Sequence, residues 1–345
     1  MAFKDFRAVF DVIFPATETS PGPGALVAPF LPCKVEAAVS DLFNQLEDTV
    51  EGNALNEVAW RKLVEEKCDA ECDSVSSKKK VLYNAAKFRL HGVECQRGGK
   101  CLLQLGITDY RSNIGTCANI SYFSQLSRAR GVGDERYLAN ALGVECFTTT
   151  SDGKAIMFRR SNLVSEYPGY YCFPGGHPEP EDILKQLLPT QLRSTADSVA
   201  ADDCSSRLRD LTVLLNGVGS EYLVRAIFDS AVMEVADELG VDRSICTNRG
   251  LLSIVKNATN RKPDAIFWVE VNETALEVQN CFDSRAGADA YESAPRSLLL
   301  VDIGDFDSGD ASIESFVEER LNGKITPASL ACLLHGTGCL RASRF

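Results

Sequence analysis

The sequence predicts an α/β protein, in which a mixed sheet lies between helices as an α/β/α sandwich and a smaller α+β domain precedes it. The second half of the chain interleaves short apolar, strand-like segments with amphipathic helical patterns. The 345 residues exceed one typical domain, and a hydrophobic content of 45% is enough for a proper core. We therefore expect an N-terminal α+β domain over residues 1–140 and the sandwich over residues 141–345.

The N-terminal domain is expected to open with helices. Residues 15–32 are rich in proline, glycine and small residues, which predicts an irregular connector. Residues 34–70 space their apolar side chains about 3.6 positions apart and predict two helices joined by a short turn near residues 52–56. Alternating apolar residues predict a strand at 101–105, and residues 120–130 predict a helix.

The sandwich is expected to begin with a hairpin. The strand-like segments 144–150 and 155–159 are joined by Ser151-Asp152-Gly153-Lys154, a good turn sequence. An insertion at about residues 183–217 mixes apolar pieces with Ser, Thr and Asp and predicts a partly helical flap. An apolar stripe from Leu223 to Leu239 then predicts one amphipathic helix.

The remaining elements complete the predicted sandwich. Aliphatic residues dominate segments 251–255, 265–271 and 297–303, which predicts buried strands. Two amphipathic segments, 313–321 and 328–334, predict helices that cover the core.

Composition narrows the classes of partner and compartment. A net charge of -12 and a pI near 4.9 argue against nucleic acid or an anionic membrane as a partner. Thirteen cysteines without a C-x2-C pair predict reduced thiols, and no apolar run is long enough to cross a membrane. We expect a cytoplasmic protein; the minor alternative is a peroxisome-like organelle, because Ser343-Arg344-Phe345 loosely resembles the Ser-Lys-Leu address. The sequence specifies no oligomeric state.

Three carboxylates gather on one predicted helix. Between Met233 and Val241, the residues Glu234, Asp237 and Glu238 lie about one turn apart and would share a helix face. Such a cluster repels itself unless a cation binds, and Mg²⁺ suits a few carboxylates beside a substrate phosphate. The alternative is an ordinary solvated helix face. The first interpretation predicts metal-dependent phosphate chemistry.

A glycine-rich loop lies upstream of this helix. In the run from Phe173 to Pro180, Gly175 and Gly176 permit backbone angles that let main-chain groups approach a ligand or ion closely. Prolines on both sides stiffen the entry and the exit of the loop.

Together the two segments resemble the box of the Nudix hydrolases, G-x5-E-x7-R-E-U-x-E-E-x-G-U, where U is aliphatic. Glu234 takes the place of the first Glu of its second half, Asp237 and Glu238 that of the acidic pair, and Gly240-Val241 that of the closing G-U.

The chain departs from this box at three points. Met233 stands where the box has Arg, so another group must brace the loop against the helix. Asp237 is one methylene shorter than Glu, which leaves a gap that a water could fill. Glu234 lies 58 positions after Gly176 where the box has 15, so about 43 residues are inserted.

These departures fit the UDP-glucose diphosphatase branch of the Nudix family in animals and plants, which the chain resembles over roughly residues 80–300. The motifs that carry the resemblance are, in order, Ala86–His91, Leu105–Arg111 with Gly115-Thr116, Arg159–Asn162, the loop Pro174–Pro180, and Glu292-Ser293.

The resemblance implies Mg²⁺-dependent hydrolysis of UDP-glucose or UDP-galactose to UMP and the sugar 1-phosphate, with Mn²⁺ as the alternative cofactor. The metal ligands would be the Gly175 carbonyl, Glu234, Asp237 and Glu238. Glu234 and Glu238 are also the expected catalytic residues, joined by Glu292 as a further ligand or general base. The alternative for Glu292 is an exposed loop carboxylate.

Seven residues are expected to bind the substrate, a small nucleotide sugar: Phe88, Arg89, Tyr110, Arg111, Arg159, Arg160 and His177. An aromatic face from the first domain could stack on uracil, and guanidinium groups match phosphate oxygens. The alternatives are a core position for Phe88 and Tyr110, a solvent-facing side chain for one of Arg159 and Arg160, and a loop-orienting role for His177.

Two other functions stay open. The nearest is a Nudix hydrolase of another nucleoside diphosphate compound, such as ADP-ribose or a coenzyme A derivative. The other is a catalytically degenerate module that binds nucleotide sugars without turnover, which Met233, Asp237 and the insertion favour and the intact Glu234 and Glu238 oppose.

Overall fold

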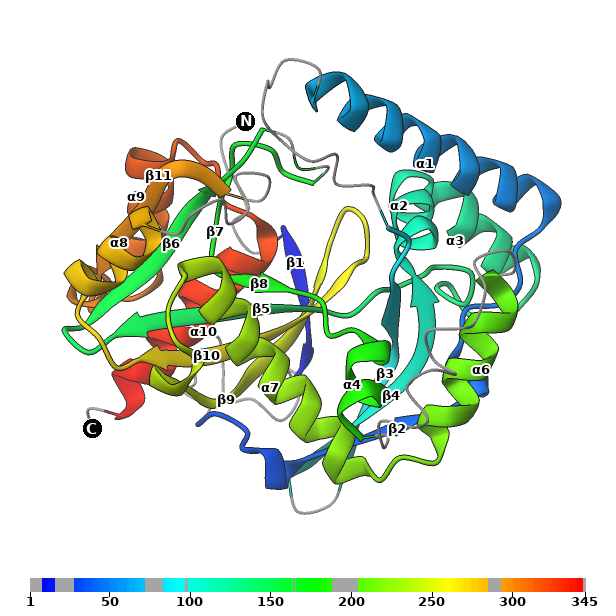
Figure 1. Ribbon diagram of the computed structural model, residues 1–345, viewed down its shortest axis with the longest axis horizontal. Coiled ribbons are helices and arrows are strands. Elements are labelled where there is room, and N and C mark those ends of the chain that lie inside the picture. The colour runs from blue at the N-terminus through cyan, green and yellow to red at the C-terminus, as the bar shows by residue number, and fades with distance from the viewer. Residues whose placement is uncertain are drawn as a thin grey trace.

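Two β-sheets and the helices around them make up the described part of the chain (Figure 1). The structure is a computed structural model that describes residues 8–15, 28–71, 83–96, 99–162, 164, 166–187, 204–284 and 293–343. Among the cysteines whose side chains are described, all are free, as the sequence predicts.

The larger sheet is mixed and has the strand order β1-β9-β10-β5-β6-β11. Its strands are β1 (Phe10–Phe14), β5 (Gly143–Thr150), β6 (Lys154–Arg160), β9 (Cys246–Asn257), β10 (Pro263–Val271) and β11 (Ser293–Asp302). β10 and β5 run parallel, and the other neighbours in this order pair antiparallel. The short strands β7 (Tyr171–Cys172) and β8 (Gly175–Gly176) pair with β6 and β5.

Helices cover both faces of this sheet. The helices α7 (Ser220–Leu239) and α8 (Ala275–Ser284) share one core cluster with the sheet, and α9 (Asp310–Leu321) and α10 (Pro327–Ser343) share the other. Strand β6 shows the alternation that produces two cores, because Ile156 and Phe158 belong to the first cluster and Ala155 and Met157 to the second. The predicted α/β/α sandwich with a mixed sheet is confirmed.

The smaller sheet consists of β2 (Val35–Val39), β4 (Lys100–Asp109) and β3 (Ala86–Gln96), with β4 in the middle. Three helices from the same part of the chain accompany it: α1 (Val50–Glu71), α2 (Tyr110–Ala118) and α3 (Ile120–Ala129). Two helices of the insertion are described, α4 (Pro180–Leu187) and α6 (Cys204–Asn216). Short 3-10 helices lie at Pro32–Lys34, Asp41–Phe43, Arg243–Ile245 and Ile303–Phe306.

No single helix in the described ranges is long and apolar enough to cross a membrane. The segments Ser206–Asn216 and Ser220–Leu239 satisfy the length and composition criteria only as a pair, and they are bent by 116°.

Two predictions for residues 34–70 are wrong. The turn expected near residues 52–56 is helical instead, because helix α1 continues through these residues. Residues 35–39 were assigned to the first of two helices, but they form strand β2, whose burial alternates with Val35, Ala37 and Val39 inside. Apolar residues at positions i and i+4 fit both a helix face and a strand face, so the spacing alone was ambiguous. The predicted strand at 101–105, the helix at 120–130 and the hairpin from 144 to 159 are confirmed.

The division at residue 140 stays a prediction. Strand β1, from the first residues described, pairs antiparallel with β9 and thus belongs to the larger sheet. The smaller sheet also shares a core cluster with α7, and the backbone N–H of Ala37 donates to Ser220 Oγ at 2.9 Å. The two sheets are therefore joined by apolar packing as well as by the chain.

Candidate active site

The glycine loop and the carboxylate helix meet in space. The backbone N–H of Gly175 donates to Oε2 of Glu238 at 2.8 Å. A Cβ placed on Gly176 would lie 2.2 Å from Oε1 of Glu234, far inside van der Waals contact. Gly176 is thus required by its close approach to α7, and the loop faces these carboxylates as the sequence predicts.

Strand β5 holds the loop from its other side. The backbone N–H of Cys146 donates to the carbonyl of Pro174 at 2.8 Å, and Gly175 pairs with Glu145 in the sheet register. A Cβ on Gly175 would lie 2.4 Å from the Val144 carbonyl oxygen. The backbone of β5 therefore supports the glycine loop.

A cavity of 510 Å³ lies beside the glycine loop and α7. Residues of the smaller sheet with its helices and residues of the sandwich both line it. The predicted site residues that line it are Tyr110, Arg160, Gly175, His177, Glu234 and Glu238. Tyr110 comes from the start of α2, Arg160 from the end of β6, and the two glutamates from one face of α7. The cavity thus lies between the smaller sheet with its helices and the sandwich.

Charged side chains line the cavity densely. Its carboxylates are Glu145, Glu166, Glu179, Glu234, Glu238 and Asp264, and its cations are Lys87, Arg160 and Lys262. Two of the cations are paired with neighbouring carboxylates: Lys87 Nζ lies 2.5 Å from Glu179 and Lys262 Nζ lies 2.7 Å from Asp264. Carboxylates outnumber cations, so the cavity has a negative formal charge.

Glu145 is a cavity carboxylate that the sequence analysis missed. It lies on β5 between buried residues and accepts a hydrogen bond from Ser329 Oγ of α10. Burial raises the pKa of Glu145 to about 7, although the Ser329 hydrogen bond opposes this shift. A single carboxylate within the apolar strand 143–150 was the available signal, because such residues are rarely placed inside without a partner or a function.

His177 keeps one ring nitrogen without a partner. Its Nε2 is buried and makes no hydrogen bond within the described residues. Burial, followed by the charges of Lys262, Lys87 and Arg160, holds the pKa of His177 well below its usual value, so the ring is neutral at pH 7. An unsatisfied ring nitrogen in a cavity wall is available to a ligand.

Three other predicted residues lie away from the cavity. Asp237 is exposed on α7, because Glu234 and Glu238 occupy the cavity face and a step of 100° per residue turns Asp237 away from it. Arg159 is exposed and donates to the Gly169 carbonyl, whereas its neighbour Arg160 points to the opposite face of β6. Arg111 forms an ion pair with Glu57 of α1, at 3.5 Å.

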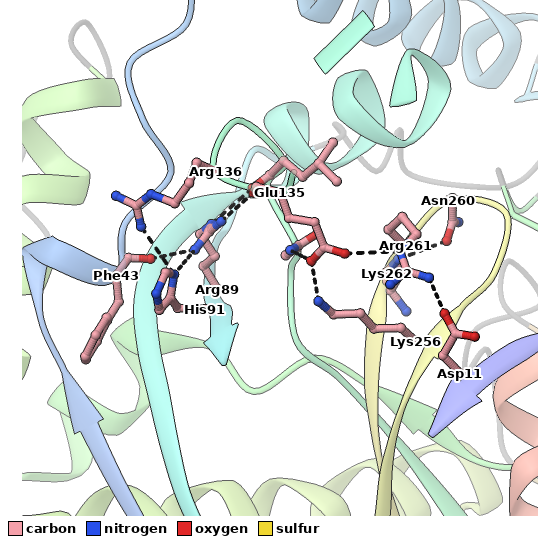
Figure 2. A network of polar contacts seen from close by, with 12 residues as sticks. Asp11, Phe43, Arg89, His91, Glu135, Arg136, Lys256, Asn260, Arg261 and Lys262 are labelled. Carbon is pink, nitrogen blue, oxygen red and sulfur yellow. Dashed lines mark hydrogen bonds and ion pairs between the residues drawn. The ribbon is translucent and has the colours of Figure 1, made fainter. Parts of the chain in front are cut away.

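Phe88 and Arg89 also differ from the expected substrate contacts. Phe88 is completely buried in the core cluster that includes the smaller sheet. The Arg89 guanidinium donates to the backbone carbonyls of Phe43 at 2.7 Å and Glu135 at 2.8 Å (Figure 2). It also donates to the carbonyl of Leu138 at 3.0 Å. Arg89 therefore joins three segments of the fold. Glu292, the remaining predicted residue, lies outside the described residues.

The insertion helices hold the rim of the cavity. Arg207 of α6 pairs with Glu181 of α4, donates to Tyr83 Oη at 2.5 Å and lies over the Tyr83 ring. Tyr83 in turn lines the cavity. The predicted flap is thus helical where it is described, and it fixes part of the cavity wall.

The donor set restricts which cation would fit. Within the described ranges, no group of three or more His, Cys, Asp or Glu side chains is arranged to hold a metal ion. Glu234 and Glu238 are two oxygen donors on one cavity face, next to the backbone of the glycine loop. Mg²⁺ is commonly bound through one or two carboxylates together with substrate phosphates and waters, so these residues fit it.

Comparison with known proteins identifies the family. No protein family model matches the chain. Uridine diphosphate glucose pyrophosphatase NUDT22 of Bos taurus is 32% identical over 219 residues, which cover 61% of this chain and 67% of that protein. The chain belongs to the Nudix hydrolase family.

Other relatives match a similar share of this Nudix chain. NUDT22 of Mus musculus, also named a uridine diphosphate glucose pyrophosphatase, is 33% identical over 61% of this chain and 63% of its own length. Nudix hydrolase 9 of Arabidopsis thaliana is 29% identical over 64% of this chain and 67% of its own length. The chain therefore spans slightly less than two thirds of the mouse relative.

Proposed function

We propose that this Nudix protein hydrolyses the diphosphate of UDP-glucose or UDP-galactose and releases UMP and the sugar 1-phosphate. One observation carries the proposal: Glu234 and Glu238, placed against the glycine loop, line the same cavity as Lys87, Arg160 and Lys262. The names of the mouse and bovine relatives support UDP-glucose as the substrate.

The charge of the cavity favours a divalent cation as part of the bound complex. A diphosphate is an anion, and it would enter a cavity in which carboxylates outnumber cations. Mg²⁺, or Mn²⁺ in its place, would be held by Glu234, Glu238 and the Gly175 carbonyl. When bound, such a cation neutralises phosphate oxygens and lowers the pKa of a coordinated water.

The cationic side chains are proposed to orient the diphosphate. Arg160 offers a planar fork of donors that matches phosphate oxygens, while its Nε is fixed by the carbonyl of Glu166 at 3.0 Å. Lys87 and Lys262 are held by their carboxylate partners, so they present their ammonium groups in one position. The free Nε2 of His177 would pair with an oxygen or hydroxyl of the substrate.

The wall from the smaller sheet and its helices is proposed to recognise the nucleoside. Tyr83, Tyr110, Asn113 and Ile114 line this side and offer aromatic faces and an amide. The ring of Tyr110 packs edge-on against Trp60 of α1, with 5.9 Å between ring centroids, which fixes its orientation. An aromatic face and an amide together suit a flat base with polar edges.

A binding module without turnover is the second candidate, because Asp237 faces solvent and only two carboxylates of the predicted three line the cavity. Nudix hydrolysis of ADP-ribose or a coenzyme A derivative is the third. The two hydrolases would release different products and the binding module would release none, so one experiment separates the three candidates.

The test is product analysis by chromatography after incubation with Mg²⁺ and UDP-glucose, UDP-galactose, ADP-ribose or coenzyme A. Wild type and Glu238→Gln are compared with Glu221→Gln, an exposed glutamate on the same helix α7 that does not line the cavity. UMP and sugar 1-phosphate from wild type and Glu221→Gln, but not from Glu238→Gln, would support the proposal. A melting shift with UDP-glucose without product would identify a binding module.

A further inference from the structure

Glu135 is the centre of an ion-pair network outside the cavity (Figure 2). Its carboxylate accepts hydrogen bonds from Lys256 Nζ, from Arg261 Nε at 3.1 Å and from Asn140 Nδ2 at 2.9 Å. Its backbone carbonyl accepts a hydrogen bond from Arg89. This single residue, in the segment between α3 and β5, thus joins the smaller sheet to β9 and to the turn that leads into β10.

The end of β9 and the turn into β10 direct side chains to two sides. Lys256 and Arg261 point toward Glu135, whereas Asn257, Asn260 and Lys262 line the cavity. On the cavity side, Asn257 Nδ2 donates to the hydroxyl of Tyr167 at 2.6 Å and Asn260 Nδ2 donates to Glu166 at 3.2 Å. Any shift of the turn would therefore be transmitted to the cavity wall.

The turn needs an external support. Arg261 has a φ of +60°, a left-handed conformation that is unfavourable for a non-glycine residue. Glu135 and Asp11 hold its guanidinium from two sides. Although burial works against ionisation of Glu135, the charges and hydrogen bonds of Lys256 and Arg261 keep its pKa below the usual value, so the carboxylate is charged at neutral pH.

We propose that Glu135 is a positioning residue: through Lys256 and Arg261 it fixes the β9–β10 turn so that Asn257, Asn260 and Lys262 face the substrate. Glu135 itself does not line the cavity. The inference rests on the proposed function for its kinetic consequence, and on the ion pairs alone for its structural one.

The test compares two carboxylates that bridge to the same strand. Glu135→Gln removes the charge at the turn, and Glu270→Gln is the matched control. Glu270 of β10 pairs with Arg249 of β9, at 2.7 Å from its Nε, near the opposite end of the two strands. Glu135→Asp keeps the charge on a shorter side chain. Each variant is studied by hydrogen exchange and by steady-state kinetics with UDP-glucose.

Glu135→Gln is expected to raise amide exchange within residues 257–262 and to raise KM roughly tenfold with a smaller change in kcat, because binding residues are misplaced. Glu135→Asp should recover most of this loss, and Glu270→Gln should show neither effect. Unchanged exchange at the turn would overturn the inference. So would an unchanged KM, or a rise in KM that Glu270→Gln reproduces at equal loss of melting temperature.

Failure of the proposed function has a different signature. If wild type cleaves no UDP-glucose, the hydrolase proposal fails, whereas the exchange comparison of Glu135→Gln with Glu270→Gln still decides whether Glu135 holds the turn. Faster exchange at 257–262 in the first variant alone would support the positioning role, and equal exchange in both variants would refute it.

Discussion

The backbone N–H of Gly175 donates to the carboxylate of Glu238 at 2.8 Å, although 63 positions separate the two residues in the chain. A charge-assisted bond of this kind orients the carboxylate that accepts it. The glycine loop therefore positions a side chain of α7 directly.

Gly176→Ala should lower both activity and stability. The new Cβ would lie 2.2 Å from Oε1 of Glu234, and the end of that side chain must move away to admit it. We expect kcat/KM for UDP-glucose to fall roughly 100-fold, while the free energy of unfolding falls by about 1–3 kcal/mol. Gly217→Ala is the matched control, because its nearest neighbour would lie 3.7 Å away. Equal activity of both variants would contradict the role of the close approach.

Arg207→Ala should destabilise the fold through the insertion. The Arg207–Glu181 pair is mostly buried, with side chains 16% and 14% exposed, so truncation leaves a carboxylate without its cation. We expect the free energy of unfolding in urea to fall by about 2–4 kcal/mol. Arg209→Ala, on the same helix, breaks an exposed pair with Glu47 and should cost less than about 1 kcal/mol. Similar losses in the two variants would show that the insertion is not anchored at Arg207.

Arg89→Lys should act on stability, because a lysine cannot donate to three separate carbonyls in the geometry of a guanidinium. The unfolding free energy is expected to fall by about 2–3 kcal/mol. Arg136→Lys, at a more exposed arginine that donates to the Leu42 carbonyl, should lose less than half of that. If Arg89→Lys kept wild-type stability but lost its affinity for UDP-glucose, the result would favour the substrate contact that the sequence predicts over the structural role.

His335 should make the folded protein less stable at acid pH. Burial lowers the pKa of its ring to about 4, while Asp310 acts weakly in the opposite direction. The unfolded chain takes up the proton at an ordinary pKa near 6.5, so the stabilising effect is complete above pH 6.5 and is lost as pH falls toward 4.

The measurement is the free energy of unfolding in urea at pH 7.5 and pH 4.5, for wild type and His335→Gln. Wild type should lose about 2–3 kcal/mol more than the variant over this interval, as a shift of this size implies. The glutamine keeps a polar partner for Ser253, whose hydroxyl lies 2.6 Å from the His335 ring. If the free energy of unfolding changed equally with pH in wild type and His335→Gln, the pKa of His335 would not differ between the folded and unfolded chains.

The sequence predicted the sandwich well because its elements carry strong periodic signals. The stripe on α7 and the aliphatic strands β9 and β10 have one clear period each. Val35–Val39 is too short to separate a helix from a strand, and it becomes a strand because β4 lies beside it in parallel register. That pairing joins residues about 66 positions apart, which no local pattern records.

The residues of the candidate site also fall into those that a local sequence pattern predicts and those that depend on distant parts of the chain. Glu234, Glu238 and the glycine loop were predictable, since their spacing follows a helix and a known motif. Glu145 and Lys262 were missed, because each is a single charged residue whose cavity position depends on the sheet order. Arg89 was assigned to the substrate since its carbonyl partners, such as Phe43 and Leu138, lie 46 and 49 positions away.

Strand β1 has a practical consequence for handling the protein. It occupies one edge of the larger sheet, with Phe10 and Phe14 buried against the cores and Asp11 paired with Arg261. Deleting the residues before Leu31 to shorten the chain would expose the open edge of β9 and an apolar strip beside it. An unpaired edge of this kind recruits another chain, so the shortened protein should self-associate and precipitate with time.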